Sequence, residues 1–361
     1  MVLSITLGIG LLLLLVRLSR LDLWKMLLQV RNLSLLDLLQ LFVLNGVLVY
    51  VSTEKWLSID AALHGPRDSS LSRIEAFTLS GTGMALGLVL PVQFGLSTVR
   101  TAGVYSHGSP IKRGIAATLF EQSFDILVGA VLAVASLITL LCRGGATMWM
   151  LCAIALGMLL FLAVRPSIRA IRQFAVYLAD RPAVSKYRGL SFVRKLCELC
   201  HSDLLSARLV RRLIVLSTAR FCVVVLMCLQ VARAIGVKIP AWHMAAAVPF
   251  TVVASAIALT PGGLGLSELT SAGALKIFGT PLAVGATWAV ANRVLILFSY
   301  FAVAGSAAIV WFMERAVAAG PAAAAKAANA AALAASQIQR QEQSDTDVAS
   351  ATSQSLTAQV R

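Results

Sequence analysis

Long apolar stretches separated by short polar segments run along the chain as far as residue 313. The hydrocarbon core of a bilayer is about 30 Å thick, and about 20 apolar residues in a helix cross it. Helices also satisfy their own backbone hydrogen bonds in lipid. The pattern therefore predicts an all-α, polytopic transmembrane helical bundle of about 7–9 helices. The apolar stretches are residues 2–16, 33–52, 74–91, 115–141, 146–164, 213–235, 241–260 and 282–313.

Two of these stretches end in sequences that interrupt a helix. Residues 261–265 combine one proline with three glycines, and a stable helix does not continue through such a run. The order Pro-x-x-x-Gly-Leu-Ser occurs there and again at residues 91–97. Paired interrupted segments are typical of transporters built from repeats. We therefore expect two broken or re-entrant helices, arising either from two repeats or from a chance similarity of apolar segments.

The second break has two explanations. Backbone freed at membrane depth must be covered by protein or must line a water-filled cavity. Ser267 could cap the helix that follows, so that the amides of Gly262, Gly263 and Gly265 face an anion such as a lipid phosphate. A tight interfacial turn with close helix packing is the alternative, and a glycine-rich sequence alone does not decide between them.

The composition supports a membrane protein. Hydrophobic residues make up 58% of the chain and charged residues 13%, whereas about a quarter of the residues in a soluble domain are charged. The longest polar segments, residues 165–212 and 314–361, are shorter than the usual ~50 to 200 residues of a domain. We expect a transmembrane domain at residues 1–315 and a disordered Ala/Gln/Ser-rich tail at residues 316–361. The uncharged first 16 residues predict a first span or anchor rather than a cleaved signal peptide.

The formal net charge of +15 comes largely from short segments between the apolar stretches. Retention of basic loops in the cytoplasm explains this better than nucleic acid as a partner. Residues 93–114 and the basic loop at residues 165–212 are expected to be cytoplasmic, in a multi-pass protein of the bacterial cytoplasmic (inner) membrane. Arg100, near this predicted boundary, either contacts a lipid phosphate on entry or only orients the protein. The N-terminus lies outside if every stretch crosses, and inside if residues 74–100 dip in and return.

A few charged and polar residues interrupt the apolar stretches themselves. Glu121 and Asp125 are four residues apart and share a helix face, while Arg220, Asn292 and Arg293 lie in later stretches. An ionised side chain at the bilayer centre costs a few kcal/mol or more, so these residues should face the bundle interior. They form either a structural network of ion pairs or a polar path on which the arginines bind phosphate.

No cofactor, metal site or hydrolytic centre is predicted. Cys197-x-x-Cys200-His201 has the spacing of a c-type haem site, but haem is attached on the outer side and this segment belongs to the loop predicted inside. The histidines are scattered, and neither Gly-x-Ser-x-Gly nor His-Glu-x-x-His occurs. We therefore expect that the protein is not an enzyme.

Together these features resemble the lysylphosphatidylglycerol synthase transmembrane region, a flippase-like membrane domain. The resemblance covers about residues 1–315, and it departs from the family pattern where Ser97 or Thr98 replaces an acid and Gln122 replaces an arginine. It implies translocation of a lipid or polyprenyl-linked headgroup between leaflets, and not lysyl transfer, for which the 361 residues leave no room. The matching pieces are Pro91-x-x-x-Gly95 followed by Arg100, Glu121-x-x-x-Asp125, Pro261-Gly262-Gly263-x-Gly265-x-x-Glu268, and Arg293.

The expected partner is therefore a membrane lipid with an anionic phospholipid or polyprenyl-phosphate headgroup. The glycines would let amides approach phosphate, Arg220 and Arg293 would supply charge, and the carboxylates would shape or gate the path. A membrane-embedded enzyme that uses Glu121 or Glu268 as acid or base is one alternative. A scaffold for lipid-biosynthesis enzymes is another, and a homo-oligomer is compatible with each. The candidate binding residues are Arg100, Glu121, Asp125, Arg220, Gly262, Gly263, Gly265, Glu268, Asn292 and Arg293.

Overall fold

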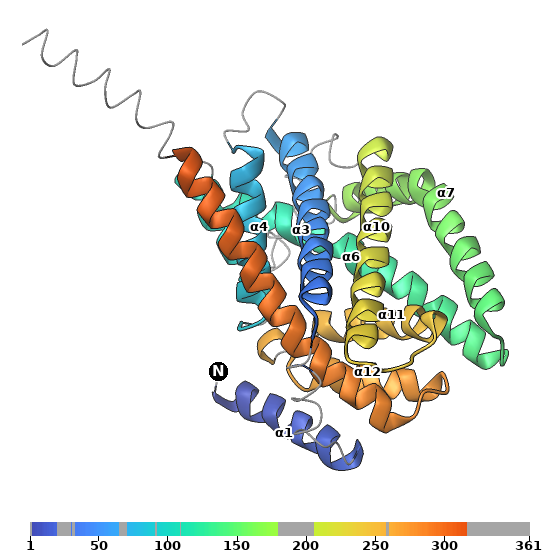
Figure 1. Ribbon diagram of the computed structural model, residues 1–361. Coiled ribbons are helices and arrows are strands. Elements are labelled where there is room, and N and C mark those ends of the chain that lie inside the picture. Colours follow the sequence, from blue (N-terminus) through green and yellow to red (C-terminus); the bar gives the residue numbers. More distant parts are fainter. Residues whose placement is uncertain are drawn as a thin grey trace, which may run out of the picture. The chain divides into compact units, whose positions relative to one another are not determined.

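The computed structural model describes residues 2–19, 30, 33–64, 71–90, 92–108, 110–179, 206–257 and 260–315. These residues form helices joined by turns, without a strand among them, and the predicted all-α class is confirmed (Figure 1). The elements are α1 (Val2–Ser19), α3 (Leu35–His64), α4 (Arg73–Gly87), α5 (Val92–Ser106), α6 (Ile111–Leu141), α7 (Ala146–Ala179), α10 (Ala207–Ala234), α11 (Ala241–Ile257), the 3₁₀ turn η1 (Pro261–Gly263), α12 (Leu266–Ile277) and the C-terminal helix (Leu282–Arg315).

Two of the predicted polar segments fall largely outside the described residues. These are residues 180–205 of the basic loop, which include the Cys-x-x-Cys-His sequence, and the tail at residues 316–361. The described ends of the predicted loop are helical, because α7 continues to Ala179 and α10 begins at Ala207. The chain divides into compact units at Met1–Ala307 and Ala308–Arg361. Every feature of the site belongs to the first unit.

Five described helices are long and apolar enough to cross a membrane. They coincide with five of the predicted apolar stretches, and the remaining stretches form the shorter helices α1, α4 and α11. α4 has 15 residues and α11 has 17, so they are about 22 and 26 Å long and fall short of a ~30 Å hydrocarbon core. The crossing helices are Leu35–Ala62 within α3, Ile111–Leu141, Ala146–Val164 within α7, Ala207–Ala234 and Leu282–Arg315.

The short helices pair into two hairpins. α4 packs against α5, and α11 packs against α12. The first hairpin lies between the crossing helices α3 and α6, and the second lies between α10 and the C-terminal helix. Each helix of the second set, which runs from α10 to the C-terminal helix, begins about 170 residues after the matching helix of the first set, which runs from α3 to α6. This order is expected of two repeats with interrupted segments.

From the lengths of the helices we infer that the hairpins enter the membrane from opposite sides. Each is too short to cross, so it returns to the side from which it came. α6, α7 and α10 cross between the two hairpins. In Figure 1, α4 begins beside the upper end of α3, whereas α11 and α12 lie at the lower end of α10. The arrangement is that of an inverted-topology repeat.

Each hairpin has its own apolar core. The largest cluster of buried residues lies among α10, α11, α12 and the C-terminal helix, and it includes Met244, Leu275 and Trp288. A second cluster lies among α3, α4, α5, α6 and α10, and it includes Trp56 and Phe124. A third, smaller cluster, which includes Leu48, Met227 and Val303, joins α3, α4, α10 and the C-terminal helix.

The α4–α5 hairpin corrects one prediction. Residues 93–114 were expected to be a cytoplasmic loop, but residues 92–106 are helix α5 and α6 begins at Ile111. The polar residues of this segment made it look like a loop, whereas α5 packs them against α4 and α6. Small residues allow the close approach: Gly95 lies against the backbone of Gly87.

The contact between Gly95 and Gly87 provides a test of the hairpin. A Cβ at residue 95 would overlap the Gly87 backbone, while a Cβ at Gly157 on α7 would meet nothing within 4 Å. Overpacking of this kind costs about 1–3 kcal/mol. We therefore expect G95A to unfold at a lower temperature in detergent. G157A is the matched control, and it should be as stable as the parent or more stable, because alanine is the better helix former. Equal thermal stability of both variants would contradict the close packing.

Candidate functional site

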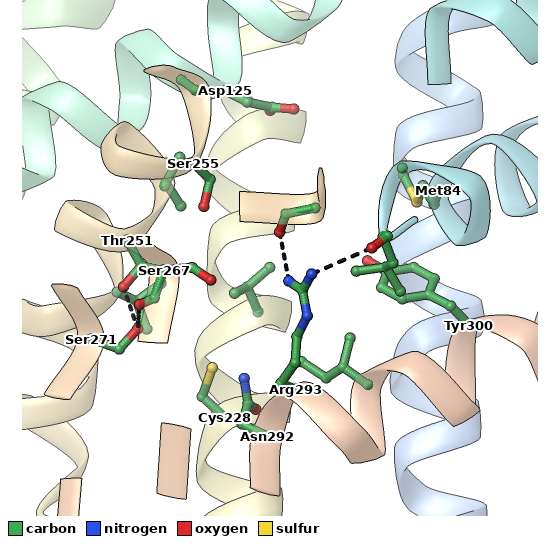
Figure 2. Close-up of a pocket in the computed structure, with 18 of the residues that line it drawn as sticks. Met84, Asp125, Cys228, Thr251, Ser255, Ser267, Ser271, Asn292, Arg293 and Tyr300 are labelled. Atoms are coloured by element: carbon green, nitrogen blue, oxygen red, sulfur yellow. Dashed lines mark hydrogen bonds between the residues drawn. The ribbon is translucent and has the colours of Figure 1, made fainter. Parts of the chain in front are cut away.

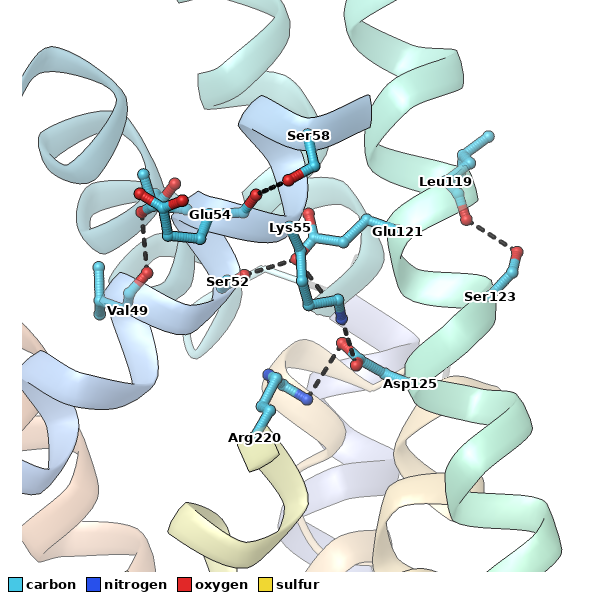
Figure 3. A network of polar contacts seen from close by, with 12 residues as sticks. Val49, Ser52, Glu54, Lys55, Ser58, Leu119, Glu121, Ser123, Asp125 and Arg220 are labelled. Atoms are coloured by element: carbon cyan, nitrogen blue, oxygen red, sulfur yellow. Dashed lines mark hydrogen bonds and ion pairs between the residues drawn. The ribbon is translucent and has the colours of Figure 1, made fainter. Parts of the chain in front are cut away.

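A network of charged side chains lies where α3, α5, α6 and α10 meet (Figure 3). Its cations are Lys55, Arg100 and Arg220, and its carboxylates are Glu121 and Asp125. α6 supplies both carboxylates because positions four residues apart share one helix face. The side chains of Lys55 and Arg100 are fully buried, and that of Glu121 is 1% exposed. These five residues are called the buried ion network below.

Arg100 is held by partners from three helices. Its guanidinium forms an ion pair with Glu121 and lies 4.9 Å from the centroid of the Trp56 ring. Its Nη2 donates to Ser80 Oγ at 2.9 Å and to Ser52 Oγ at 3.1 Å, and Ser52 Oγ donates to Glu121 Oε1 at 2.6 Å. Charge-assisted hydrogen bonds of this kind compensate for taking a guanidinium out of water. Arg100 therefore lies inside the bundle, with its guanidinium engaged by protein groups.

Asp125 connects the fully buried Lys55 to the more exposed Arg220. Lys55 Nζ donates to Asp125 Oδ1, and Arg220 Nη1 lies 3.2 Å from Asp125 Oδ2. Lys55 Nζ is also 3.9 Å from Glu121 Oε1. Three cations face two carboxylates, so the network carries one surplus positive charge. The side chain of Arg220 is 25% exposed, which makes it the member best placed to offer that charge to a ligand.

The broken ends of the two hairpins contact each other directly. The Gly262 amide donates to Leu90 O at 2.8 Å. Arg293 Nη1 donates to Gly262 O at 2.6 Å, and its Nη2 donates to Leu88 O at 3.4 Å (Figure 2). Glu268 Oε1 lies 3.7 Å from Arg293 Nε. These five residues, called the hairpin junction below, satisfy backbone groups that the two breaks free within the bilayer.

Glycine is required at the centre of this junction. Gly262 has a φ of +55°, and a Cβ there would overlap Leu88 O and the Arg293 guanidinium. The other glycine amides have protein acceptors: that of Gly263 donates to Thr260 O at 2.9 Å, and that of Gly265 donates to Glu268 Oε2 at 2.6 Å. In this structure the glycines therefore shape the turn, and their amides are engaged by the protein rather than open to an anion.

The cap of α12 differs from the prediction. Its N-cap is Gly265, two residues before Ser267, so the expectation that Ser267 caps this helix is wrong. Glu268 reaches back to the Gly265 amide and replaces a hydroxyl cap. A glutamate at the third helical position commonly does this.

A cavity of about 300 Å³ lies between the two hairpins and the crossing helices (Figure 2). The structure brings most of the predicted binding residues to its wall, from both the buried ion network and the hairpin junction. Arg100, Gly263 and Gly265 lie off the wall. The predicted residues that line the cavity are Glu121, Asp125, Arg220, Gly262, Glu268, Asn292 and Arg293.

Sequence reasoning missed Lys55 and its neighbour Ser52. The apolar stretch was taken to end at residue 52, whereas α3 continues to His64. Two signals were available: apolar residues recur after Lys55, at Trp56 and Ile59, and an intramembrane carboxylate pair needs cations. The serines carried no signal, because serine is common in membrane helices.

The described residues contain no group of three or more His, Cys, Asp or Glu side chains that could hold a metal ion. The polar groups of the cavity are instead arginines, carboxylates, amides and hydroxyls. This donor set suits an organic anion, because arginine pairs with phosphate or carboxylate through charge-assisted hydrogen bonds.

Crossing helices, re-entrant hairpins and a charged cavity between them define a multi-pass membrane protein with an intramembrane polar site. The model of the family described as "Lysylphosphatidylglycerol synthase TM region" matches residues 1–304. The chain belongs to this family, and membership indicates a membrane protein involved in lipid handling. Neither the curated proteins nor the solved structures gave a match.

Proposed function

We propose that this protein moves a phosphate-bearing lipid headgroup, on an anionic phospholipid or a polyprenyl phosphate, between the leaflets of the bacterial cytoplasmic membrane. The observation that carries the proposal is the cavity between the two hairpins, which Arg220 from α10 and Arg293 from the C-terminal helix both line. A headgroup needs a polar path across lipid, and its phosphate needs cations along it. The surplus charge of the buried ion network favours an anion over a cation.

The bonding of the carboxylates supports transport without a covalent change in the lipid. Both oxygens of Glu121 are engaged, by Ser52 and Arg100. Glu268 Oε2 accepts from the Gly265 amide, and its Oε1 faces Arg293. A general acid or base must reach the proton that it transfers, and these carboxylates are committed to the fold. They would keep the arginines in place and balance their charge.

Reconstitution tests the proposal. The full chain is placed in liposomes that contain a fluorescent anionic phospholipid, and an impermeant reductant reports how fast the lipid reaches the outer leaflet. We expect faster exchange than in protein-free liposomes. R220Q should lower the rate about ten- to hundredfold, because a hydrogen bond to a charged group contributes about 1.5–3 kcal/mol. R233Q is the matched control on the same helix, because Arg233 is 63% exposed and lies off the cavity wall.

Mass spectrometry of the recovered lipid distinguishes transport from chemistry. An unchanged lipid mass supports transport, while a mass change would identify a membrane-embedded enzyme and overturn the proposal. Equal rates with and without protein, for anionic phospholipids and for polyprenyl phosphates, would also overturn it. In that case a scaffold for lipid-biosynthesis enzymes becomes the better explanation.

A further inference from the structure

Within the buried ion network, Lys55 is the cation that has no carboxylate to itself. Arg100 forms an ion pair with Glu121. Arg220 Nη1 lies 3.2 Å from Asp125 Oδ2. Lys55 shares both acids with these arginines, because its Nζ donates to Asp125 Oδ1 and lies 3.9 Å from Glu121 Oε1 (Figure 3). With Lys55 protonated the network carries one surplus positive charge, and with Lys55 neutral it carries none.

The surplus charge is costly at the position of Lys55. Its side chain is fully buried, and a charge without compensation destabilises a protein inside a bilayer. Deprotonation of the lysine can remove the charge, because proteins do not deprotonate arginine, whereas a buried lysine does release its proton. A neutral amine still has N–H groups, so the hydrogen bond from Lys55 to Asp125 survives the change.

Other titratable groups lie on the elements that pack around α3. α6 and α10 face Lys55 with the two carboxylates and with Arg220. On the C-terminal helix, Tyr300 lies beside Arg220 on the cavity wall, and a phenol is neutral at physiological pH. On α4, Glu75 lies 3.4 Å from His107 Nε2 on α5. A histidine titrates near physiological pH, so His107 is the competing source of a pH response and is tested below.

We propose that Lys55 is a proton-binding site that couples the movement of the anionic headgroup to a proton. Without a ligand the amine of Lys55 is neutral. When a phosphate pairs with Arg220 at the cavity wall, Lys55 takes up a proton, and the phosphate balances the surplus charge. The headgroup and the proton then cross together as a neutral unit. The proposal rests on the proposed function and adds its source of energy, a proton gradient.

Asp125 gives the proton a route between Lys55 and the cavity. It accepts the hydrogen bond from Lys55, its side chain is 13% exposed, and it lines the cavity. On release, the Nζ–H bond breaks and the proton passes to Asp125 Oδ1 and then to water that enters the cavity. The products are a neutral amine, an ionised Asp125 and a hydronium ion. Glu121 is not on this route, because Ser52 and Arg100 engage its two oxygens.

Asp125 also links proton binding to anion binding. It contacts Lys55 through Oδ1 and Arg220 through Oδ2. A phosphate that draws Arg220 away leaves this carboxylate to the Lys55 ammonium, and the added negative charge favours the protonated lysine. By linkage, protonation of Lys55 raises the affinity of the cavity for the anion by the same factor.

Proton uptake on lipid binding tests the site in the full chain. Dioctanoyl phosphatidylglycerol is added to the protein in detergent, and the heat of binding is measured at neutral pH in buffers of different ionisation enthalpy. The phosphodiester stays ionised, so any proton taken up belongs to the protein. We expect uptake that approaches one proton per bound lipid. Binding without proton uptake by the parent protein would overturn the inference.

A pH gradient across liposomes tests the coupling itself. Potassium and valinomycin hold the membrane potential at zero, and an impermeant reductant reports the share of fluorescent phosphatidylglycerol in the outer leaflet. A lipid that moves with one proton accumulates in the leaflet on the alkaline side. We expect about a tenfold enrichment there for each pH unit, because one unit is a tenfold ratio of proton activity. Protein-free liposomes give the baseline.

Variants of lysine and histidine identify the proton site. K55M removes the ammonium, and K55R makes the charge permanent, because arginine keeps its proton. Both should bind lipid without proton uptake at this residue, and both should leave the leaflet ratio near unity. K112M, which changes an exposed lysine on α6, is the matched control and should keep the enrichment. H107Q should keep it too, and its loss in H107Q but not in K55M would assign the proton to the histidine and refute the role of Lys55.

The outcomes separate this inference from the proposed function. Rapid lipid exchange with a leaflet ratio near unity in the parent would overturn proton coupling and leave transport intact. No exchange at all would overturn the proposed function, and the coupling with it. If K55M and K55R do not fold, proton uptake by the parent still decides, because that measurement needs no variant.

Discussion

Replacing Arg100 by methionine is expected to leave little folded protein. The change removes the guanidinium that pairs with Glu121, and Glu121 is 1% exposed. Removing one member of a buried ion pair costs about 3–5 kcal/mol, because the remaining charge has no compensation. That cost is a large share of the roughly 5–15 kcal/mol by which a protein is typically stable. The measurement is the fraction of R100M that remains monodisperse after heating in detergent.

Two further variants make this result interpretable. K112M removes a charge from an exposed residue at the start of α6 and should behave as the parent does. The double variant R100M/E121M replaces the whole pair with apolar side chains, which is often neutral or stabilising, so it should recover part of the folded fraction. If R100M alone is as stable as K112M, the pairing of Arg100 with Glu121 does not hold the bundle together.

The second large effect is expected at Arg293, and it concerns transport. R293A removes the side chain that donates to carbonyl groups on both hairpins, Leu88 O and Gly262 O. The direct bond from the Gly262 amide to Leu90 O remains, so the fold should persist while the junction loosens. We expect at least a tenfold slower exchange of the labelled lipid, which corresponds to loss of one hydrogen bond to a charged group.

R293K sharpens this experiment. A lysine keeps the charge but lacks the planar fork that lets one side chain reach two carbonyl groups. It should therefore transport poorly, close to R293A. K276A, on the exposed side of α12, is the control and should transport as the parent does. Full activity of R293A would show that the arginine only supports the fold, and full activity of R293K would show that its charge alone matters.

The architecture was largely predictable from the sequence, because lipid imposes strong rules on backbone groups. The apolar stretches, the two breaks and their recurrence about 170 residues apart all follow from the length and spacing of apolar residues. α5 was missed because its serines, threonines and Arg100 resemble a loop when their packing partners are unknown. Local composition does not reveal that a polar helix is buried inside a bundle.

The residues of the candidate site were predictable from the sequence, but the ion pairs and hydrogen bonds among them were not. Glu121, Asp125, Arg220, Glu268 and Arg293 stand out as charges in apolar stretches, and all of them line the cavity. Which arginine pairs with which acid depends on tertiary packing. Lys55 was missed because the apolar stretch was taken to end at residue 52, and its pairing with Asp125 depends on the fold. The engagement of the glycine amides likewise depends on Leu90 and Glu268, which are distant in sequence or one turn away.

Helix α7 lies at the outside of the bundle and has a consequence for the whole architecture. Only 6% of its most apolar segment is buried, against 28–33% for the other crossing helices, although α7 packs against α6, α10 and α11. Its contribution is to the number of membrane crossings between the two hairpins. With α7, an odd number of crossings separates the hairpins and they oppose each other; without it the number would be even, and both would open to the same compartment. α7 thus supplies the additional crossing that inverts the second repeat relative to the first.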